Sequence, residues 1–268
     1  MTPASDTSTL LKHLLAVELL PFYAGCQVHR SPHGRIITHA AFSFLYDANL
    51  ILIDSPTPIG VKTLEAEAAP HFELSGVTHL RFVQGDPERT AWMIPRFVAA
   101  GYRRLQYLIM AHTRPSDRAP VPEIRMNPVL GPTGHGVLDR IDNDLMREVP
   151  WNSPMIRAAL RTRRREVTNH IDLRWFWASI NGVPAGSIAL LRAGSIASIQ
   201  SVSTRPALRG RAVATTMVLE MVETARALGH STVCLMTEAE DWPRHLYAQL
   251  GFEAVGYVES FLKSDGPG

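Results

Sequence analysis

The feature of this sequence that most limits its fold is a strand that runs through a basic turn directly into a helix. Residues 195–204 have the composition of a strand, and apolar residues recur at helical spacing from Val213 onward. Between them, Arg209 and Arg211 flank Gly210. The first amides of a helix have no intrahelical acceptor and lie at the positive end of the helix dipole. With two arginines beside them, these amides predict an anion site suited to a pyrophosphate.

A second segment, residues 241–252, predicts a short helix near the C-terminal end of the sequence. It reads Asp-Trp-Pro-Arg-His-Leu-Tyr-Ala-Gln-Leu-Gly-Phe. Pro243 suits the first turn of a helix and Gly251 suits its C-terminal end. The helix between them carries Tyr247.

Together, these two segments resemble motifs of the GCN5-related N-acetyltransferase (GNAT) superfamily. Residues 209–214 are similar to its motif A, Arg/Gln-x-x-Gly-x-Gly/Ala, with Ala212 in place of the first glycine. Alanine admits a phosphate closely if its φ stays negative. Residues 246–252 are similar to the family's Leu-Tyr-x-x-Leu-Gly-Phe ending. Taken singly, the segments have ordinary alternatives, a solvated helix end and a tyrosine packed in a helix seam. The resemblance extends over residues 123–263.

The resemblance implies an acetyl-CoA site and assigns roles to its residues. Backbone amides of Val202, Ser203 and Thr204 would hold the pantetheine and the thioester oxygen of the donor. The turn would hold its pyrophosphate through Arg209, Gly210, Arg211, Ala212, Val213, Ala214 and Thr215. Tyr247 would protonate the departing thiolate.

The general base is less well defined by the sequence. The subfamily that the chain resembles has a glutamate where this sequence has Gln200. Glutamine does not accept a proton usefully at neutral pH, but it could orient a water or the acceptor substrate. Glu238 is the candidate base, with Glu240 beside it; an ordinary loop carboxylate and a water chain are the alternatives.

The order of the predicted elements indicates an α/β (α+β) fold. Asn181-Gly182 lies between two strand patterns and is a strong hairpin signal. The remaining elements are helices over 138–148, 154–165 and 213–228 and strands over 123–126, 232–237 and 253–263. This order matches the GNAT fold, a mixed central sheet with flanking helices.

The first half of the chain is interpreted as a degenerate copy of the same fold. Ala100-Gly101-Tyr102 repeats the pattern of Leu250-Gly251-Phe252, after a strand at 76–83 and a helix at 88–100. Where a phosphate turn would stand, residues 54–60 contain two prolines, which have no amide donor. We therefore divide the chain into a GNAT-like domain without CoA (1–115), a Pro-rich linker (116–136) and a catalytic GNAT domain (123–268) whose first strand lies in the linker region. An unrelated α/β cap is the alternative for the first half.

Composition restricts the partners. A net charge of +2 over 268 residues gives no general attraction for nucleic acid. No apolar run is long enough to span a bilayer and the N-terminus lacks a signal-peptide pattern, so we expect a cytoplasmic protein without a membrane partner. Neither the two cysteines nor His29, His33 and His39 have the spacing of a ligand set, and no metal is expected. The run at 161–165 is a solvated basic helix end, or a contact for the 3′-phosphate of CoA or for an acidic substrate.

The resemblance implies an acyl-CoA-dependent N-acyltransferase, with acetyl-CoA as donor and a small amine as acceptor. An amino acid, a polyamine and an amine-bearing antibiotic all belong to that class. Two alternatives stay open: a non-catalytic acyl-CoA-binding sensor or scaffold, and an enzyme that modifies a protein or an RNA. The sequence has no RNA-binding motif to support the RNA version.

Overall fold

The structure is a computed structural model that describes residues 4–264. The chain divides into two compact units. Unit 1 contains Met1–Ile109, Thr237–Asp241 and Val255–Gly268, and unit 2 contains Met110–Met236 and Trp242–Ala254. Three strands contribute residues to both units: β5 (Arg103–His112), β10 (Thr232–Glu238) and β11 (Phe252–Lys263).

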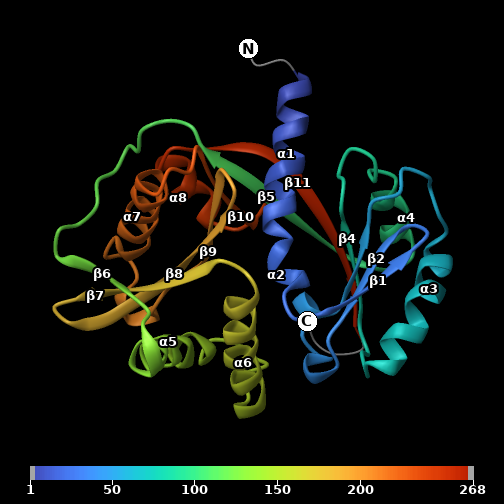
Figure 1. Cartoon of the computed structure of the whole chain (residues 1–268), viewed down its shortest axis with the longest axis horizontal. Coiled ribbons are helices and arrows are strands. Elements are labelled where there is room, and N and C mark those ends of the chain that lie inside the picture. The colour runs from blue at the N-terminus through green and yellow to red at the C-terminus, as the bar shows by residue number, and fades with distance from the viewer. Residues whose placement is uncertain (1–3, 265–268) are drawn as a thin grey trace. The chain divides into compact units, whose positions relative to one another are not determined.

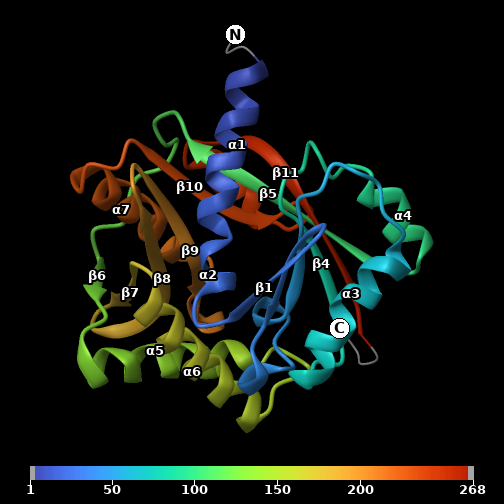
Figure 2. The same cartoon turned by 45° about the vertical axis from the view of Figure 1, so that its right-hand side comes forward.

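Unit 2 contains a mixed sheet with helices on both sides. Its strands follow the order β10-β9-β8-β7-β6, in which only β9 and β10 are parallel. The elements are β6 (Ile124–Pro128), α5 (Gly131–Met146), α6 (Pro154–His170), β7 (Leu173–Ile180), β8 (Val183–Ala193), β9 (Ile196–Thr204), a 3-10 turn (Pro206–Leu208), α7 (Val213–Ala227) and α8 (Pro243–Gln249). Helix α7 packs on β8 and β9 and α5 packs on β8. Figures 1 and 2 show these two helices on opposite sides of the strand.

Gly186 allows α7 to approach β8 closely. A Cβ atom there would lie 2.4 Å from the Ser203 carbonyl oxygen and 3.1 Å from a methyl group of Val213. Both distances are too short for a side chain to fit without a shift of its neighbours. Because Gly186 has no side chain, the start of α7 can pack closely against the strands that precede the basic turn.

The basic run at 161–165 serves to join α6 to α5. Arg164 is paired with both Asp139 and Asp142, and Arg161 binds Asn143. Arg164 is almost buried, with its guanidinium over the ring of Trp175. Arg161 and Arg164 are therefore engaged within the unit, whereas Arg165 is 53% exposed and 3.7 Å from Asp139. The alternative that the run binds a 3′-phosphate or an acidic substrate stays a prediction.

The region predicted as a linker contains regular structure. β6 agrees with the strand expected there, but α5 begins at Gly131 rather than near residue 138. Pro132 lies in the first turn of α5, where proline is tolerated because that amide has no intrahelical acceptor. A proline that the composition attributed to a linker is therefore part of a helix start.

Unit 1 contains a second group of strands and has its own core. Its strands follow the order β1-β2-β3-β4-β11-β5, and β3 and β4 are parallel. The elements are α1 (Ala4–Glu18), α2 (Leu20–Tyr23), β1 (Gln27–Ser31), β2 (Gly34–Thr38), 3-10 turns (Ala40–Phe42 and Tyr46–Ala48), β3 (Leu50–Ile53), α3 (Val61–Leu74), β4 (Leu80–Gln84) and α4 (Met93–Ala99). The rings of Phe82, Phe97, Tyr102 and Phe261 pack together in its core. The predicted strand at 76–83 and helix at 88–100 are both shorter, beginning at Leu80 and Met93.

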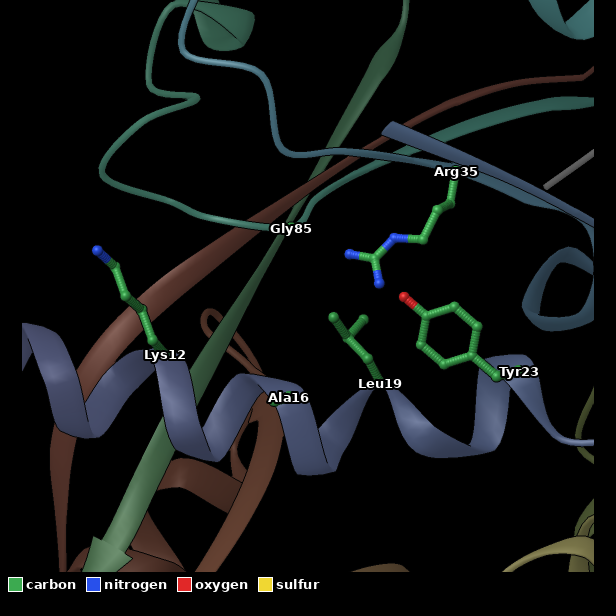
Figure 3. A pocket seen from close by; sticks show the side chains of 6 residues that line it. All are labelled: Lys12, Ala16, Leu19, Tyr23, Arg35 and Gly85. Atoms are coloured by element: carbon green, nitrogen blue, oxygen red, sulfur yellow. The ribbon is translucent and has the colours of Figure 1, made fainter. Parts of the chain in front are cut away.

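Unit 1 has a small pocket beside α1 and α2, shown in Figure 3. Its volume is about 130 Å³, and its lining residues are Lys12, Ala16, Leu19, Tyr23, Arg35 and Gly85. Figure 3 shows the Tyr23 hydroxyl directed toward the Arg35 guanidinium, with Lys12 directed away from both. Pockets for cofactor-sized ligands are typically about 300–1,000 Å³, so this one is too small for coenzyme A.

Candidate active site

The turn before α7 leaves a row of backbone amides without an acceptor. Along residues 210–216, the first amide that is hydrogen-bonded is that of Thr216, which donates to the carbonyl oxygen of Ala212 at 3.0 Å. Within the described part of the chain, the amides of residues 210–215 have no acceptor. Gly210 has φ +75° and Ala212 has φ +55°. Left-handed residues next to helical ones turn successive N–H groups toward one concave side, which binds anions.

The conformation of Ala212 differs from the expectation. Close approach of a phosphate is expected to need a negative φ at this residue, whereas Ala212 is left-handed and occupies the N-cap of α7 without a side-chain cap bond. An L-residue in this region costs about 1–2 kcal/mol. The site therefore retains its amides, and the residue that replaces glycine carries strain.

The arginines of the turn are not equivalent. Arg209 forms a bidentate ion pair with Glu148, at 2.7 Å and 3.2 Å. Arg205 binds Asp144 at 2.6 Å and the Pro184 carbonyl oxygen at 2.8 Å. Arg211 is exposed and has no ion pair with any residue that the structure describes. Arg211 is therefore the one cation of the predicted turn that is available to an anion without losing a partner.

Strand β9 has an open edge just before this turn. Its parallel pairing with β10 covers Ile196 to Ile199 only, although β9 continues to Thr204. On its other side β9 pairs with β8, and one extra residue of β9 bulges out where Ser201 adopts φ +52°. A bulge and a lost partner both free backbone groups from the ladder. Val202, Ser203 and Thr204 lie in this segment, and the hydroxyls of Ser203 and Ser187 are 2.7 Å apart.

Tyr247 lies on α8, the short helix predicted between Pro243 and Gly251. It is 8 % exposed, and its ring lies edge-on to Phe252 with centroids 6.2 Å apart. Gly251 ends the helix with φ +92°, and a Cβ there would lie 2.1 Å from the Arg114 carbonyl oxygen. Helix α8 thus presents a nearly buried tyrosine in the same unit as the turn and the open edge of β9.

Gln200, the residue expected to orient a water or the acceptor, and Glu238, the candidate base, lie in different units. Gln200 is on β9 in unit 2, and its amide nitrogen donates to the Ser198 hydroxyl at 2.7 Å. Glu238 is the exposed last residue of β10 and belongs to unit 1, as does Glu240. The assignment of Glu238 as the base stays a prediction.

Sequence reasoning missed Asp144 and Glu148, the two acids that hold Arg205 and Arg209. Each acid lies 61 residues before its arginine. The acids are four residues apart near the end of α5, and the arginines are four residues apart in the turn. This matched spacing is a signal in the sequence, but only the fold shows that the two pairs meet.

Comparison with known proteins identifies the domain. Residues 138–244 match the family model described as acetyltransferase (GNAT) domain. Among solved structures, a GCN5-related N-acetyltransferase from Kribbella flavida has a TM-score of 0.68 at 13% identity, covering 96% of each chain. A functionally unknown conserved protein from Staphylococcus epidermidis also has a TM-score of 0.68, at 11% identity over 90% of this chain and 95% of that one.

A tandem GNAT protein from the clavulanic acid biosynthesis pathway has a TM-score of 0.59 at 13% identity. It covers 99% of this chain and 97% of its own. No curated protein matches this chain. The architecture is therefore that of the GNAT fold over the full length, and the predicted fold class is confirmed.

Residues 138–244 thus match a GNAT acetyltransferase domain, and the chain as a whole has the fold of a tandem GNAT protein. The family and the fold support acyl-CoA-dependent N-acetyl transfer in general. Among the residues described, no cluster of three or more His, Cys, Asp or Glu side chains has the arrangement of a metal site. In the same range, no helix has the length and apolar character needed to cross a bilayer.

Proposed function

We propose that this protein transfers the acetyl group of acetyl-CoA to a primary amine of a small molecule, and that unit 2 holds the donor. The observation that carries this proposal is the row of acceptor-free amides at residues 210–215. A pyrophosphate supplies several acceptor oxygens and two negative charges, which match these donors and the positive end of α7. Arg211 adds a charge without breaking an ion pair.

The open edge of β9 is the proposed place for the pantetheine arm. Pantetheine contains two amide groups, which can bond to backbone groups as an added strand does. Val202, Ser203 and Thr204 lie on this edge directly before the turn, so an arm that starts at the pyrophosphate would run along them. One of their amides would polarise the thioester carbonyl and stabilise the oxyanion that forms on it.

The reaction requires two proton movements. The neutral amine attacks the thioester carbon, a C–N bond forms, and the C–S bond breaks as the tetrahedral intermediate collapses. Tyr247 donates its proton to the thiolate, and the nitrogen loses a proton to a base. Gln200 cannot take that proton. We therefore propose Glu238, or a water in its place, as the acceptor of the amine proton.

We further propose that unit 1 does not bind coenzyme A. Pro56 and Pro58 remove two amides from the segment that corresponds to the turn. The amides of Asp54 and Ser55 are already bonded to the His33 carbonyl oxygen. The 130 Å³ pocket beside α1 and α2 is also too small for the cofactor. These observations support a single donor site per chain.

The test is an acyl-transfer assay. Purified protein is incubated with acetyl-CoA and amines from three groups, amino acids, polyamines and aminoglycoside-like amines, and the released CoA thiol is measured with a chromogenic reagent. Thiol release that depends on one of these amines supports the proposal. Binding of one acetyl-CoA per chain without turnover on any amine favours the sensor or scaffold, and turnover only on peptide amines favours a protein N-acetyltransferase.

A further inference from the structure

Two acid–arginine pairs connect the end of α5 to the phosphate turn, and they differ in exposure. The side chains of Arg209 and Glu148 are 54% and 47% exposed. Those of Arg205 and Asp144 are 28% and 21% exposed, and Arg205 also binds a carbonyl oxygen of β8. Arg205 is therefore fixed as part of the scaffold, whereas the pair of Arg209 is open to solvent and free to exchange.

The pair of Arg209 uses the donors that a phosphate would need. Glu148 accepts hydrogen bonds from both terminal nitrogens of the guanidinium, in the bidentate arrangement that also suits a phosphate. A carboxylate and a pyrophosphate cannot occupy that same edge of the guanidinium together. Close to the turn, the carboxylate would also repel the phosphate charges.

We propose that Glu148 is an internal competitor of the donor's pyrophosphate, and this inference rests on the proposed function of the turn. In the free protein Glu148 holds Arg209. Donor binding displaces Glu148 from Arg209. Because the ion pair must be broken for the donor to bind, the affinity for the donor is lower than it would be without Glu148. Acetyl-CoA and CoA carry the same pyrophosphate, so Glu148 weakens the binding of product as much as that of substrate. Its effect is to speed the release of CoA after the reaction.

The same geometry predicts that replacement of Arg209 and replacement of Arg211 reduce the affinity for CoA by different amounts. Arg211 engages a phosphate without losing a partner, so Arg211→Ala removes its full contribution. Arg209 exchanges one anion for another, so Arg209→Ala costs less in the wild-type background. When Glu148 is neutral, Arg209 is free in the unbound protein, and its replacement then costs more.

The experiment is a double-mutant cycle on CoA affinity, measured by calorimetry on the full chain. Exposed ion pairs contribute about 0.2–1 kcal/mol, so Glu148→Gln should bind CoA about 1.5- to 5-fold more tightly. Arg209→Ala should weaken binding more in the Glu148→Gln background than in the wild type. Glu223→Gln is the matched control, because it neutralises an exposed carboxylate paired with Arg226 ten residues along α7. That control should leave the affinity unchanged.

Repeating the titration with 3′-dephospho-CoA locates the effect. The gain from Glu148→Gln should persist, because this ligand retains the pyrophosphate. A gain that disappears with this ligand would overturn the proposal by placing the competition at the 3′-phosphate. Equal CoA affinity in wild type and Glu148→Gln, or an equal gain in Glu223→Gln, would also overturn it. Wild-type protein that binds no CoA at all would instead refute the proposed function.

Discussion

Replacement of Ala212 by glycine should stabilise the protein, although glycine usually destabilises the interior of a helix. Ala212 is left-handed, with φ +55° and ψ 23°, and has no side-chain cap bond to compensate. Relief of the left-handed strain is worth about 1–2 kcal/mol. The extra freedom of glycine in the unfolded chain costs about 0.5–1 kcal/mol. The balance is a gain of about 0.5–1 kcal/mol in the free energy of unfolding for Ala212→Gly.

Tryptophan fluorescence is a suitable assay for this change. Four of the five tryptophans, all but Trp92, belong to unit 2, so the signal reports mainly on the unit that contains Ala212. Urea denaturation should show a higher midpoint with an unchanged slope. Ala214→Gly is the control, because Ala214 lies inside the first turn of α7. This variant should lose up to about 1 kcal/mol in the free energy of unfolding. If both variants lose stability equally, Ala212 is not left-handed and the account of the turn is wrong.

Three further predictions test the site and the fold. Tyr247→Phe should lower kcat about 10²-fold with little change in the KM for acetyl-CoA, whereas a tyrosine that only packs against its neighbours would lose thermal stability instead. Gly186→Ala should lower the free energy of unfolding, measured by urea denaturation, by about 1–3 kcal/mol and should weaken CoA binding, because the new Cβ would lie 2.4 Å from a carbonyl oxygen. A variant as stable as the wild type would contradict the close approach of α7. Burial lowers the pKa of His79, which is 3% exposed, so the folded protein favours the neutral ring. The stability that this group contributes is therefore present above about pH 6.5 and is lost as the pH falls. The loss is at most about 1.4 kcal/mol per pH unit. His79→Gln should therefore flatten the pH dependence of the urea midpoint between pH 7 and pH 5, and parallel curves for the two proteins would refute this.

The parts of the site that the sequence predicted are those governed by local patterns. The start of α7 follows from helical spacing after a basic turn, and α8 follows from Pro243 and Gly251 at its two ends. Both depend on residues that are neighbours in the chain, so periodicity and capping rules are sufficient. The same rules place Tyr247 on a helix.

The remaining features depend on tertiary contacts. Alanine favours negative φ, and only the path of the chain into α7 places Ala212 in the left-handed region. The pairing of Glu148 with Arg209 joins residues 61 positions apart. The loss of pairing between β9 and β10 after Ile199 is likewise a property of the sheet, because it depends on where the neighbouring strand β10 runs.

A crystal structure of the full chain with CoA tests the central claim most directly. The account predicts one CoA per chain, with its pyrophosphate on the amides of residues 210–215, Arg211 in contact with a phosphate oxygen, and the thiol within hydrogen-bond reach of the Tyr247 hydroxyl. CoA bound to unit 1, or bound to unit 2 with its pyrophosphate away from this turn, would contradict it.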